Sequence, residues 1–185
     1  KNKINKIINF LIAPSWGVNG LIEIGSAIKL ITKILYEDIV VVLRPHPESY
    51  KKSKKQILEI KNKFKYNKNF LLEENICSHE TLIKSDLLIT DWSGIAFDFA
   101  LGLNKPVIFT NTKPKINNKN YKDINIEPIE IQCRKNLGRV IDLDEIPDFI
   151  IREKYKNVTI NKSFIELFEN DIKSLVKSLL NLKLN

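Results

Sequence analysis

Short apolar segments alternate with segments of helical periodicity along most of this chain. The apolar segments predict strands, and five of them precede residue 111: Ile7–Ala13, Ile39–Leu43, Phe70–Leu72, Leu87–Thr90 and Pro106–Thr110. Strands that alternate with helices at this spacing are typical of βαβ crossovers in a parallel sheet. The pattern therefore predicts an α/β fold: a Rossmann-like parallel sheet with helices on both faces.

The segments between these strands predict helices at Leu21–Leu35, Ser49–Lys65, Cys77–Ser85 and Ile95–Leu103. In the first of them, apolar residues recur at positions i, i+3, i+4 and i+7, which is the spacing of a helix that faces a core. The second is polar and rich in Lys on its outer side, which indicates a surface helix.

The pattern weakens after residue 110. Residues 111–127 are rich in Asn and Lys without a period, which indicates either a loop on the ligand side of the sheet or a locally disordered segment. Weak strands are predicted at Ile129–Ile131 and Val140–Ile141, and helices at Glu145–Tyr155 and Ser163–Leu182. No internal repeat or low-complexity linker divides the chain. Residues 1–185 are therefore predicted to be one Rossmann-like domain with a C-terminal amphipathic helix.

The formal net charge of +8 comes from 30 basic and 22 acidic residues, and nearly all the basic residues are lysines. Arginine, which reads bases and clamps a nucleic-acid backbone, occurs at four positions only, namely Arg44, Arg134, Arg139 and Arg152. The composition favours a solvated Lys-rich surface over a nucleic-acid surface, so no nucleic-acid partner is predicted. Attraction to an anionic membrane or to a polyanionic acceptor is the weaker alternative.

Two cysteines, Cys77 and Cys133, lie far apart in the sequence and indicate neither a disulfide framework nor a zinc site. A reducing compartment is the default expectation. No apolar run approaches the roughly 20 residues that cross a bilayer. Neither a metal nor a cofactor is predicted. The chain begins at Lys1 and contains no Met, from which we expect an excised piece of a longer protein.

Polar residues follow the second and fourth predicted strands. Arg44-Pro45-His46-Pro47 comes after the second strand, and Thr90-Asp91-Trp92-Ser93-Gly94 leads from the fourth into an apolar helix. Residues just past the carboxyl ends of parallel strands are where α/β proteins bind ligands, and a helix N-terminus offers N–H groups to a phosphate. The two segments together predict a pocket for an anionic ligand.

Several common signatures of α/β enzymes are absent. The turn after the first strand is not G-x-G-x-x-G, and the chain has no Walker A lysine, no G-x-S-x-G and no H-E-x-x-H. This leaves the Rossmann-like domains that bind nucleotide-activated donors at the carboxyl edge of the sheet.

The predicted catalytic residues are His46 and Asp91. His46, held between two prolines, can donate to a phosphate oxygen or act as a general acid or base, or it can be a turn histidine bound to the backbone. Asp91 can orient His46 or Ser93, or it can cap the helix that follows. His79, on the helix before the fourth strand, is read as a solvated or capping residue.

The predicted phosphate-binding and donor-binding residues surround this pair. Arg44 can pair with a pyrophosphate or form a surface ion pair. Ser93 and the Gly94 N–H can cradle a phosphate, or Ser93 can simply cap the helix. Thr90 belongs to the same polar strand end. Asp98 is either a donor-site carboxylate or a partnered buried acid.

Three of these segments resemble one family. Arg44–Pro47, Ser85–Ala100 and Lys105–Phe109 look like the CDP-glycerol glycerophosphotransferases, and Ile12–Trp16 looks like that family's first strand and turn. The family comprises teichoic-acid and capsule polymerases that transfer a polyol phosphate from a CDP donor. The resemblance covers roughly residues 7–109, with a looser similarity to residue 143. Trp92 and Gly94 stand where the family usually has Tyr and Ser.

The resemblance implies the donor-binding, carboxyl-terminal half of a GT-B-like transferase with two Rossmann-like halves. It implies attack by an acceptor hydroxyl on the β-phosphorus of a CDP-polyol or another nucleotide-activated donor, and it makes Glu127, or Glu130, a candidate for holding the ribose hydroxyls. The implied partners are a polymer or lipid-linked acceptor and a facing N-terminal domain of the same protein. The implied location is the cytoplasm, either free or peripheral at the inner face of the cell membrane.

Three other functions stay open at this point. The chain can be a GT-B glycosyltransferase donor domain that uses a nucleotide sugar. It can be a non-catalytic nucleotide-binding module, or a surface protein that binds polyanions. The last predicts binding that collapses with salt and does not depend on His46.

Overall fold

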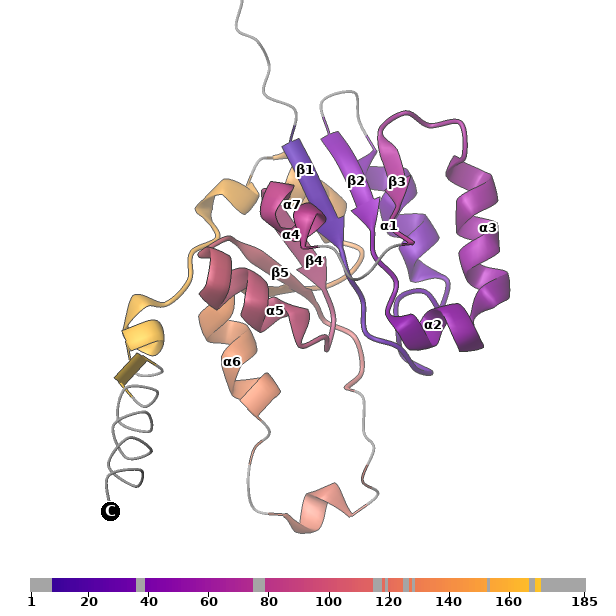
Figure 1. The fold of residues 1–185 in the computed structure, drawn as a ribbon. Coiled ribbons are helices and arrows are strands. Elements are labelled where there is room, and N and C mark those ends of the chain that lie inside the picture. The colour runs from indigo at the N-terminus through magenta and orange to yellow at the C-terminus, as the bar shows by residue number, and fades with distance from the viewer. Residues whose placement is uncertain are drawn as a thin grey trace, which may run out of the picture.

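The computed structural model describes residues 8–35, 39–74, 79–114, 118, 120–124, 127, 129–152, 154–166 and 169–170. In this part of the chain, six parallel strands form one sheet in the order β3-β2-β1-β4-β5-β6 (Figure 1). The strands are β1 (Ile8–Ile12), β2 (Ile39–Leu43), β3 (Phe70–Leu72), β4 (Leu87–Thr90), β5 (Val107–Thr110) and β6 (Arg139–Ile141). This is the strand order of the doubly wound Rossmann fold, and the order reverses between β1 and β4.

The central strands are largely buried on both faces because their sequences are mostly apolar. On β1, Phe10 pairs with Val41 of β2 and with Leu87 of β4. Phe10 and Ile12 pack into the core on one face of the sheet, whereas Leu11 packs into the core on the other face. The alternation of side chains along each strand thus supplies two cores from one run of apolar residues.

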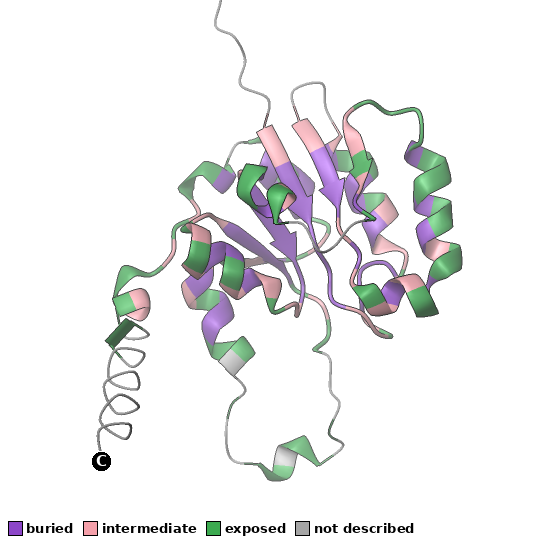
Figure 2. Ribbon diagram, viewed as in Figure 1, coloured by how far each residue is buried: buried purple, intermediate pink, exposed green. Residues whose placement is uncertain are grey.

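Helices cover both faces of the sheet (Figures 1 and 2). One core includes residues of α1 (Ser26–Ile34), α3 (Lys54–Phe64) and α7 (Ile146–Ile151). The other includes residues of α4 (Glu80–Lys84), α5 (Ile95–Phe97) and α6 (Ile129–Leu137). A short helix α2 (Pro47–Lys52) follows β2, a π-helical turn η1 (Asp98–Gly102) continues α5, and two 3₁₀ turns lie at η2 (Tyr121–Asp123) and η3 (Lys154–Asn157).

The fold class and all five strands predicted before residue 111 are confirmed, as is the strand at Val140–Ile141. The strand predicted at Ile129–Ile131 is wrong, because these residues begin α6. The I-E-I alternation suggested a strand, but β5 and β6 are parallel neighbours. Parallel neighbours need a crossover between them, and α6 provides it by burying Cys133 and Leu137.

Helix boundaries differ from the predictions where the backbone turns. The first helix begins at Ser26 rather than Leu21, after Gly25 with φ of 72°. The predicted helix Ser49–Lys65 is two helices that meet at Ser53. The helix predicted at Glu145–Tyr155 ends at Ile151 and is followed by η3.

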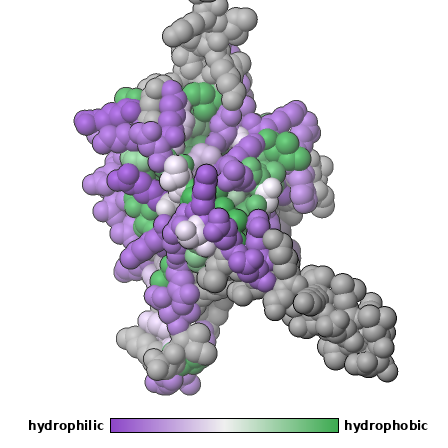
Figure 3. Space-filling model, turned by 90° about the vertical axis from the view of Figure 1, so that its left-hand side faces the viewer, coloured by the Kyte–Doolittle hydropathy of each residue, from purple (hydrophilic) through white to green (hydrophobic). Residues whose placement is uncertain are grey.

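Two predicted helices extend beyond the described residues. Cys77 and Ser78, at the start of the predicted helix Cys77–Ser85, lie outside them, and so does most of Ser163–Leu182. In the described part of the chain, no helix has both the length and the apolar character that a membrane crossing requires. Figure 3 shows mostly hydrophilic side chains, with scattered apolar areas, on the face that it displays.

Candidate functional site

A hollow of about 460 Å³ lies at the carboxyl ends of β1, β2 and β4, beside the point where the strand order reverses. Five of the predicted site residues line it: Arg44, His46, Ser93, Gly94 and Asp98. The turn after β1 supplies a third wall through Pro14, Ser15 and Trp16, which were not predicted as site residues. Their place directly after the first strand was the available sequence signal.

His46 stands at the N-cap of α2, followed by Pro47 at the first helical position. Its Nδ1 accepts a hydrogen bond from the Glu48 N–H at 3.1 Å. In a neutral imidazole, this contact places the ring hydrogen on Nε2, which makes that nitrogen the donor. The ring lies 6.1 Å from the Trp16 ring, between centroids. His46 is therefore a capping residue and a wall of the hollow at the same time.

A carboxylate holds α2 against the turn after β1. The hydroxyls of Ser49 and Ser53 each donate to Glu23 Oε1 at 2.8 Å. The Glu23 carboxylate lies so near Gly20 that a Cβ at residue 20 would be 2.3 Å from Oε2. Glycine at this position thus permits the contact that fixes the helix carrying His46.

Arg44 lines the hollow and is also paired within the protein. Its Nη1 lies 3.6 Å from Glu73 Oε2, and the two side chains are only 11% and 7% exposed. The Thr81 hydroxyl donates to the same carboxylate at 2.8 Å. The ion pair considered from the sequence is present but largely buried, and a contact of Arg44 with a phosphate stays a prediction.

Thr90 and Asp91 connect the ends of β4 and β1 and are not among the residues that line the hollow. Thr90 is fully buried, and its hydroxyl donates to the Ala13 carbonyl at 2.7 Å. Asp91 is 1% exposed, and its Oδ1 accepts the N–H groups of Ser15 and Trp92, each at 2.6 Å. The structure thus places Asp91 as a clamp between two walls of the hollow.

The burial of Asp91 has an electrostatic consequence. Its second oxygen, Oδ2, is buried and accepts no hydrogen bond within the described residues. Burial raises the pKa of the Asp91 carboxyl above its usual value, while the N–H groups of Ser15 and Trp92 oppose the rise. A catalytic role for Asp91 stays a prediction.

Trp92 is held from behind by Arg134, a residue that the sequence did not single out. The Arg134 guanidinium lies 3.9 Å from the Trp92 ring centroid and 5.3 Å from that of Phe109. Arg134 is 6% exposed and donates to the Thr110 carbonyl at 2.6 Å. Burial lowers the pKa of Arg134 to about 10, and the nearby Asp91 charge opposes the fall.

Replacing Arg134 by methionine should lower the free energy of unfolding by about 2 kcal/mol, because the buried Thr110 carbonyl loses its charged donor. Lysine should not restore the wild-type state, since it lacks the planar group that stacks on Trp92. Urea unfolding measures the change in stability. We also expect both variants to shift the fluorescence emission of Trp92, which is measured in a Trp16→Phe background so that Trp92 is the one tryptophan left. Arg152→Met, at an exposed position, is the matched control. Wild-type emission in both variants would contradict this role.

Ser93, Gly94 and Asp98 form the remaining wall. Gly94 occupies the N-cap position of α5, and no side chain caps this helix, so the reading of Ser93 as a helix cap is wrong. Asp98 is exposed and begins the π-helical turn, so the reading of it as a buried acid is also wrong. Its side chain is accessible from the hollow, which leaves a donor-site carboxylate as its predicted role.

The other candidates lie apart from the hollow. Glu127 is exposed and does not line it, whereas Glu130 lines a small cavity beside Arg134 and Cys133. Contact of either carboxylate with ribose stays a prediction. His79 is exposed at the start of α4 and caps nothing there, which fits a solvated residue.

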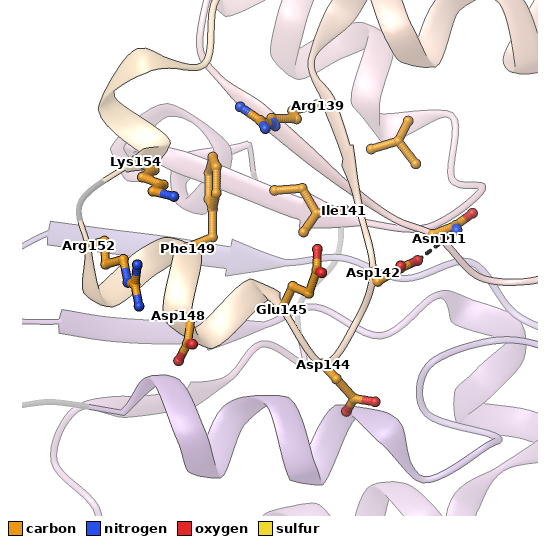
Figure 4. Close-up of a pocket in the computed structure, with 11 residues that line it drawn as sticks. Asn111, Arg139, Ile141, Asp142, Asp144, Glu145, Asp148, Phe149, Arg152 and Lys154 are labelled. Atoms are coloured by element: carbon orange, nitrogen blue, oxygen red, sulfur yellow. Dashed lines mark hydrogen bonds between the residues drawn. The ribbon is translucent and has the colours of Figure 1, made fainter.

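A second hollow, of about 580 Å³, lies between β6 and α7 (Figure 4). Arg152 and Lys154 lie on one side of Phe149, and Asp142 lies on the other, bonded to Asn111 at 2.7 Å. This hollow is larger but mixes acidic and basic side chains at the edge of the sheet. We assign the site to the hollow at the reversal of strand order, where open α/β sheets bind ligands. Within the described residues, no acidic, His or Cys cluster is arranged to hold a metal ion.

Comparison with known sequences gives one family. The family model described as CDP-Glycerol:Poly(glycerophosphate) glycerophosphotransferase matches residues 6–123, which include every element that lines the hollow. A search of curated proteins finds no match.

Comparison with solved structures supports the fold. UDP-GlcNAc 2-epimerase from Neisseria meningitidis, bound to UDP-GlcNAc, is 19% identical, with a TM-score of 0.54 over 94% of this chain and 45% of that one. The Methanocaldococcus jannaschii UDP-GlcNAc 2-epimerase, in complex with UDP-GlcNAc and UDP, is 16% identical. Its TM-score is 0.52, over 78% of this chain and 38% of that one. The chain thus spans less than half the length of these neighbours. The predicted Rossmann-like, GT-B-like fold is confirmed.

Proposed function

Because this chain belongs to the CDP-glycerol:poly(glycerophosphate) glycerophosphotransferase family, we propose that it binds a nucleotide-activated donor in the hollow at the ends of β1, β2 and β4. The donor we propose is a CDP-polyol, with glycerol phosphate transferred to a polymer or lipid-linked acceptor at the cell surface. The observation that carries the proposal is that Arg44, His46, Ser93 and Gly94 converge on one hollow at the reversal of strand order.

The proposed reaction is a phosphoryl transfer. An acceptor hydroxyl attacks the β-phosphorus of the donor, a new P–O bond forms, and the bond from that phosphorus to the bridging oxygen breaks. CMP leaves with the bridging oxygen, and the hydroxyl proton is lost to a base. Charge on the phosphate oxygens would be stabilised by Arg44, by His46 and by the backbone N–H groups around Ser93 and Gly94.

The tautomer of His46 defines its proposed part. Because Nδ1 accepts from the Glu48 N–H, the neutral ring carries its hydrogen on Nε2. We therefore propose that His46 donates a hydrogen bond to a phosphate oxygen of the donor or to the leaving CMP oxygen. In this tautomer, the electron pair of Nε2 belongs to the aromatic ring, so Nε2 cannot take the acceptor proton.

Calorimetric titration with CDP-glycerol, CDP, CMP and UDP-GlcNAc tests the proposal. We expect the cytidine diphosphates to bind and UDP-GlcNAc to bind more weakly. Arg44→Gln should weaken the binding of the two diphosphates more than the binding of CMP, because the substitution removes a positive charge at the hollow. Absence of binding by every nucleotide would overturn the transferase proposal.

A nucleotide sugar is the second candidate donor. It is favoured by the two structural neighbours, whose structures contain UDP-GlcNAc. Preferential binding of UDP-GlcNAc in the same titration would replace the CDP-polyol by this candidate. Tight nucleotide binding without transfer in any form of the protein would instead favour a non-catalytic module.

The 185 residues alone should bind nucleotide weakly and should not turn over. The hollow is open, and the chain spans only 38% and 45% of its structural neighbours, so we propose that a facing half brings the acceptor to the donor. Single-turnover assays with labelled CDP-glycerol and an acceptor measure this. Sustained polymer synthesis by these residues alone would contradict the need for a second half.

A further inference from the structure

The positive charge of this chain is concentrated in one segment. Residues 47–68 contain eight lysines and two glutamates, a net charge of +6 in a chain whose formal net charge is +8. This segment comprises α2, α3 and the turn that follows. The lysines thus form a localised feature of the surface.

Most of these lysines are exposed and carry no compensating charge. On α3, the residues Ile57, Ile60 and Phe64 face the core, whereas Lys54, Lys55 and Lys63 are exposed. In the described part of the chain, these three lysines form no ion pair, nor do Lys65 and Lys68 in the turn. Lys51 and Lys52 share one carboxylate, that of Glu48.

This surface is continuous with the proposed donor site. Lys52 Nζ lies 4.1 Å from the ring centroid of Trp16, and Trp16 lines the hollow. α2 begins directly after His46, and α3 runs from its end along the β3 side of the sheet (Figure 1). We name the exposed side chains of Lys51, Lys52, Lys54, Lys55, Lys63 and Lys65 the lysine face.

We propose that the lysine face binds a linear polyanion with phosphodiester repeats, and that this polyanion is the acceptor polymer. The identification of the polyanion as the acceptor rests on the proposed function. A cluster of flexible ammonium groups suits a chain of phosphates, because such binding needs charge density rather than a shaped pocket. Because Lys52 contacts Trp16, the lysine face would hold the polymer beside the donor site, and the facing half would then place the end of the polymer against the donor.

The packing of α3 favours a polymer over a membrane as the partner. A helix that inserts into a bilayer interface offers its apolar face to the lipid. The apolar face of α3 instead packs into the core against the sheet, where Ile57, Ile60 and Phe64 are at most 6% exposed. What remains outside is charge, with Leu58 and Tyr66 as isolated apolar side chains.

The test measures binding of a fluorescent synthetic glycerol-phosphate oligomer to the 185-residue chain. The variant K54Q/K55Q/K63Q removes three charges from the lysine face without touching a residue that lines the hollow. The control K135Q/K154Q/K162Q removes the same charge from exposed positions outside residues 47–68. We expect the first variant to weaken oligomer binding by roughly a factor of ten or more and to flatten its salt dependence, and the control to change it little.

Nucleotide titration of both variants separates this proposal from the proposed function. Unchanged CDP-glycerol binding with weakened oligomer binding supports the lysine face. Equal oligomer affinity in both variants, or no oligomer binding by the wild type, overturns it even where nucleotide binding is intact. Binding to vesicles of phosphatidylglycerol and phosphatidylcholine is measured in the same way. If K54Q/K55Q/K63Q weakens vesicle binding more than oligomer binding, the proposal is overturned in favour of a membrane surface.

Discussion

Replacement of Asp91 by alanine is expected to lower the free energy of unfolding by about 3 kcal/mol, because two buried N–H groups lose their acceptor. Those groups belong to Ser15 and Trp92, each 2.6 Å from Asp91 Oδ1. Both residues line the hollow, so nucleotide binding should weaken as well. Urea unfolding and calorimetric titration measure the two effects. An alanine variant as stable as the wild type would show that the clamp contributes nothing to the fold.

Asparagine at residue 91 separates the hydrogen bonds from the charge. Its amide oxygen can accept both N–H groups, so Asp91→Asn should cost less than Asp91→Ala. Because burial raises the pKa of Asp91 in the folded state, its stabilising contribution is fully present below the unfolded pKa and is lost as pH rises through the folded pKa. The stability of the wild type relative to Asp91→Asn should therefore fall as pH rises above the ordinary Asp pKa of about 4. The exposed Glu59→Gln is the control, and a difference that grows with pH would contradict the sign.

The sheet could be predicted because its strands are short apolar runs with a helix between each pair. A run such as Ile39–Leu43, apolar at every position, is typical of a parallel strand that is covered on both faces. The strand prediction at Ile129–Ile131 was wrong because the segment is so short. Three residues cannot distinguish the period of 2 of a strand from the period of 3.6 of a helix. Only the pairing of β5 with β6 requires a helix there.

Helix boundaries were less predictable because they depend on contacts between distant residues. The break at Ser53 accompanies a hydrogen bond to Glu23, which lies 30 positions earlier in the sequence. The late start of α1 reflects a left-handed Gly25, whose sequence neighbours do not reveal its φ.

The candidate site was predictable where residues follow strands directly. Arg44, His46 and Ser93 come one to three residues after β2 and β4, and the strand order brings those ends together. Arg134 could not be found in this way, because it lies on α6 and reaches Trp92 only through the packing of that helix. Its burial against two aromatic rings is a property of the tertiary structure alone.

The sequence predicted a solvated Lys-rich surface from a net charge of +8 with few arginines. Where the lysines gather on that surface depends on the fold. The lysines of residues 47–68 are exposed together, because α3 turns its apolar residues to the core. A helix converts a sequence in which Lys and Ile alternate irregularly into one charged and one buried face.

Replacement of His46 should have the largest effect on transfer. In any form of the protein that is active, His46→Ala should lower the transfer rate by roughly 10²–10⁴-fold, because a positioned donor or acid is lost. The same variant should lower the free energy of unfolding by about 1 kcal/mol, because α2 loses its N-cap. Rates are measured with labelled CDP-glycerol, and stability by urea unfolding.

Asparagine at residue 46 distinguishes the two roles of the histidine. Its side-chain oxygen can cap the Glu48 N–H, as Nδ1 does, but it offers no group at the position of Nε2. We therefore expect His46→Asn to restore stability and to leave transfer as slow as in His46→Ala. His79→Ala, at an exposed position with no capping bond, should leave both quantities unchanged. If His46→Asn transfers at the wild-type rate, then His46 serves only to start α2, and the hydrogen on Nε2 has no part in the reaction.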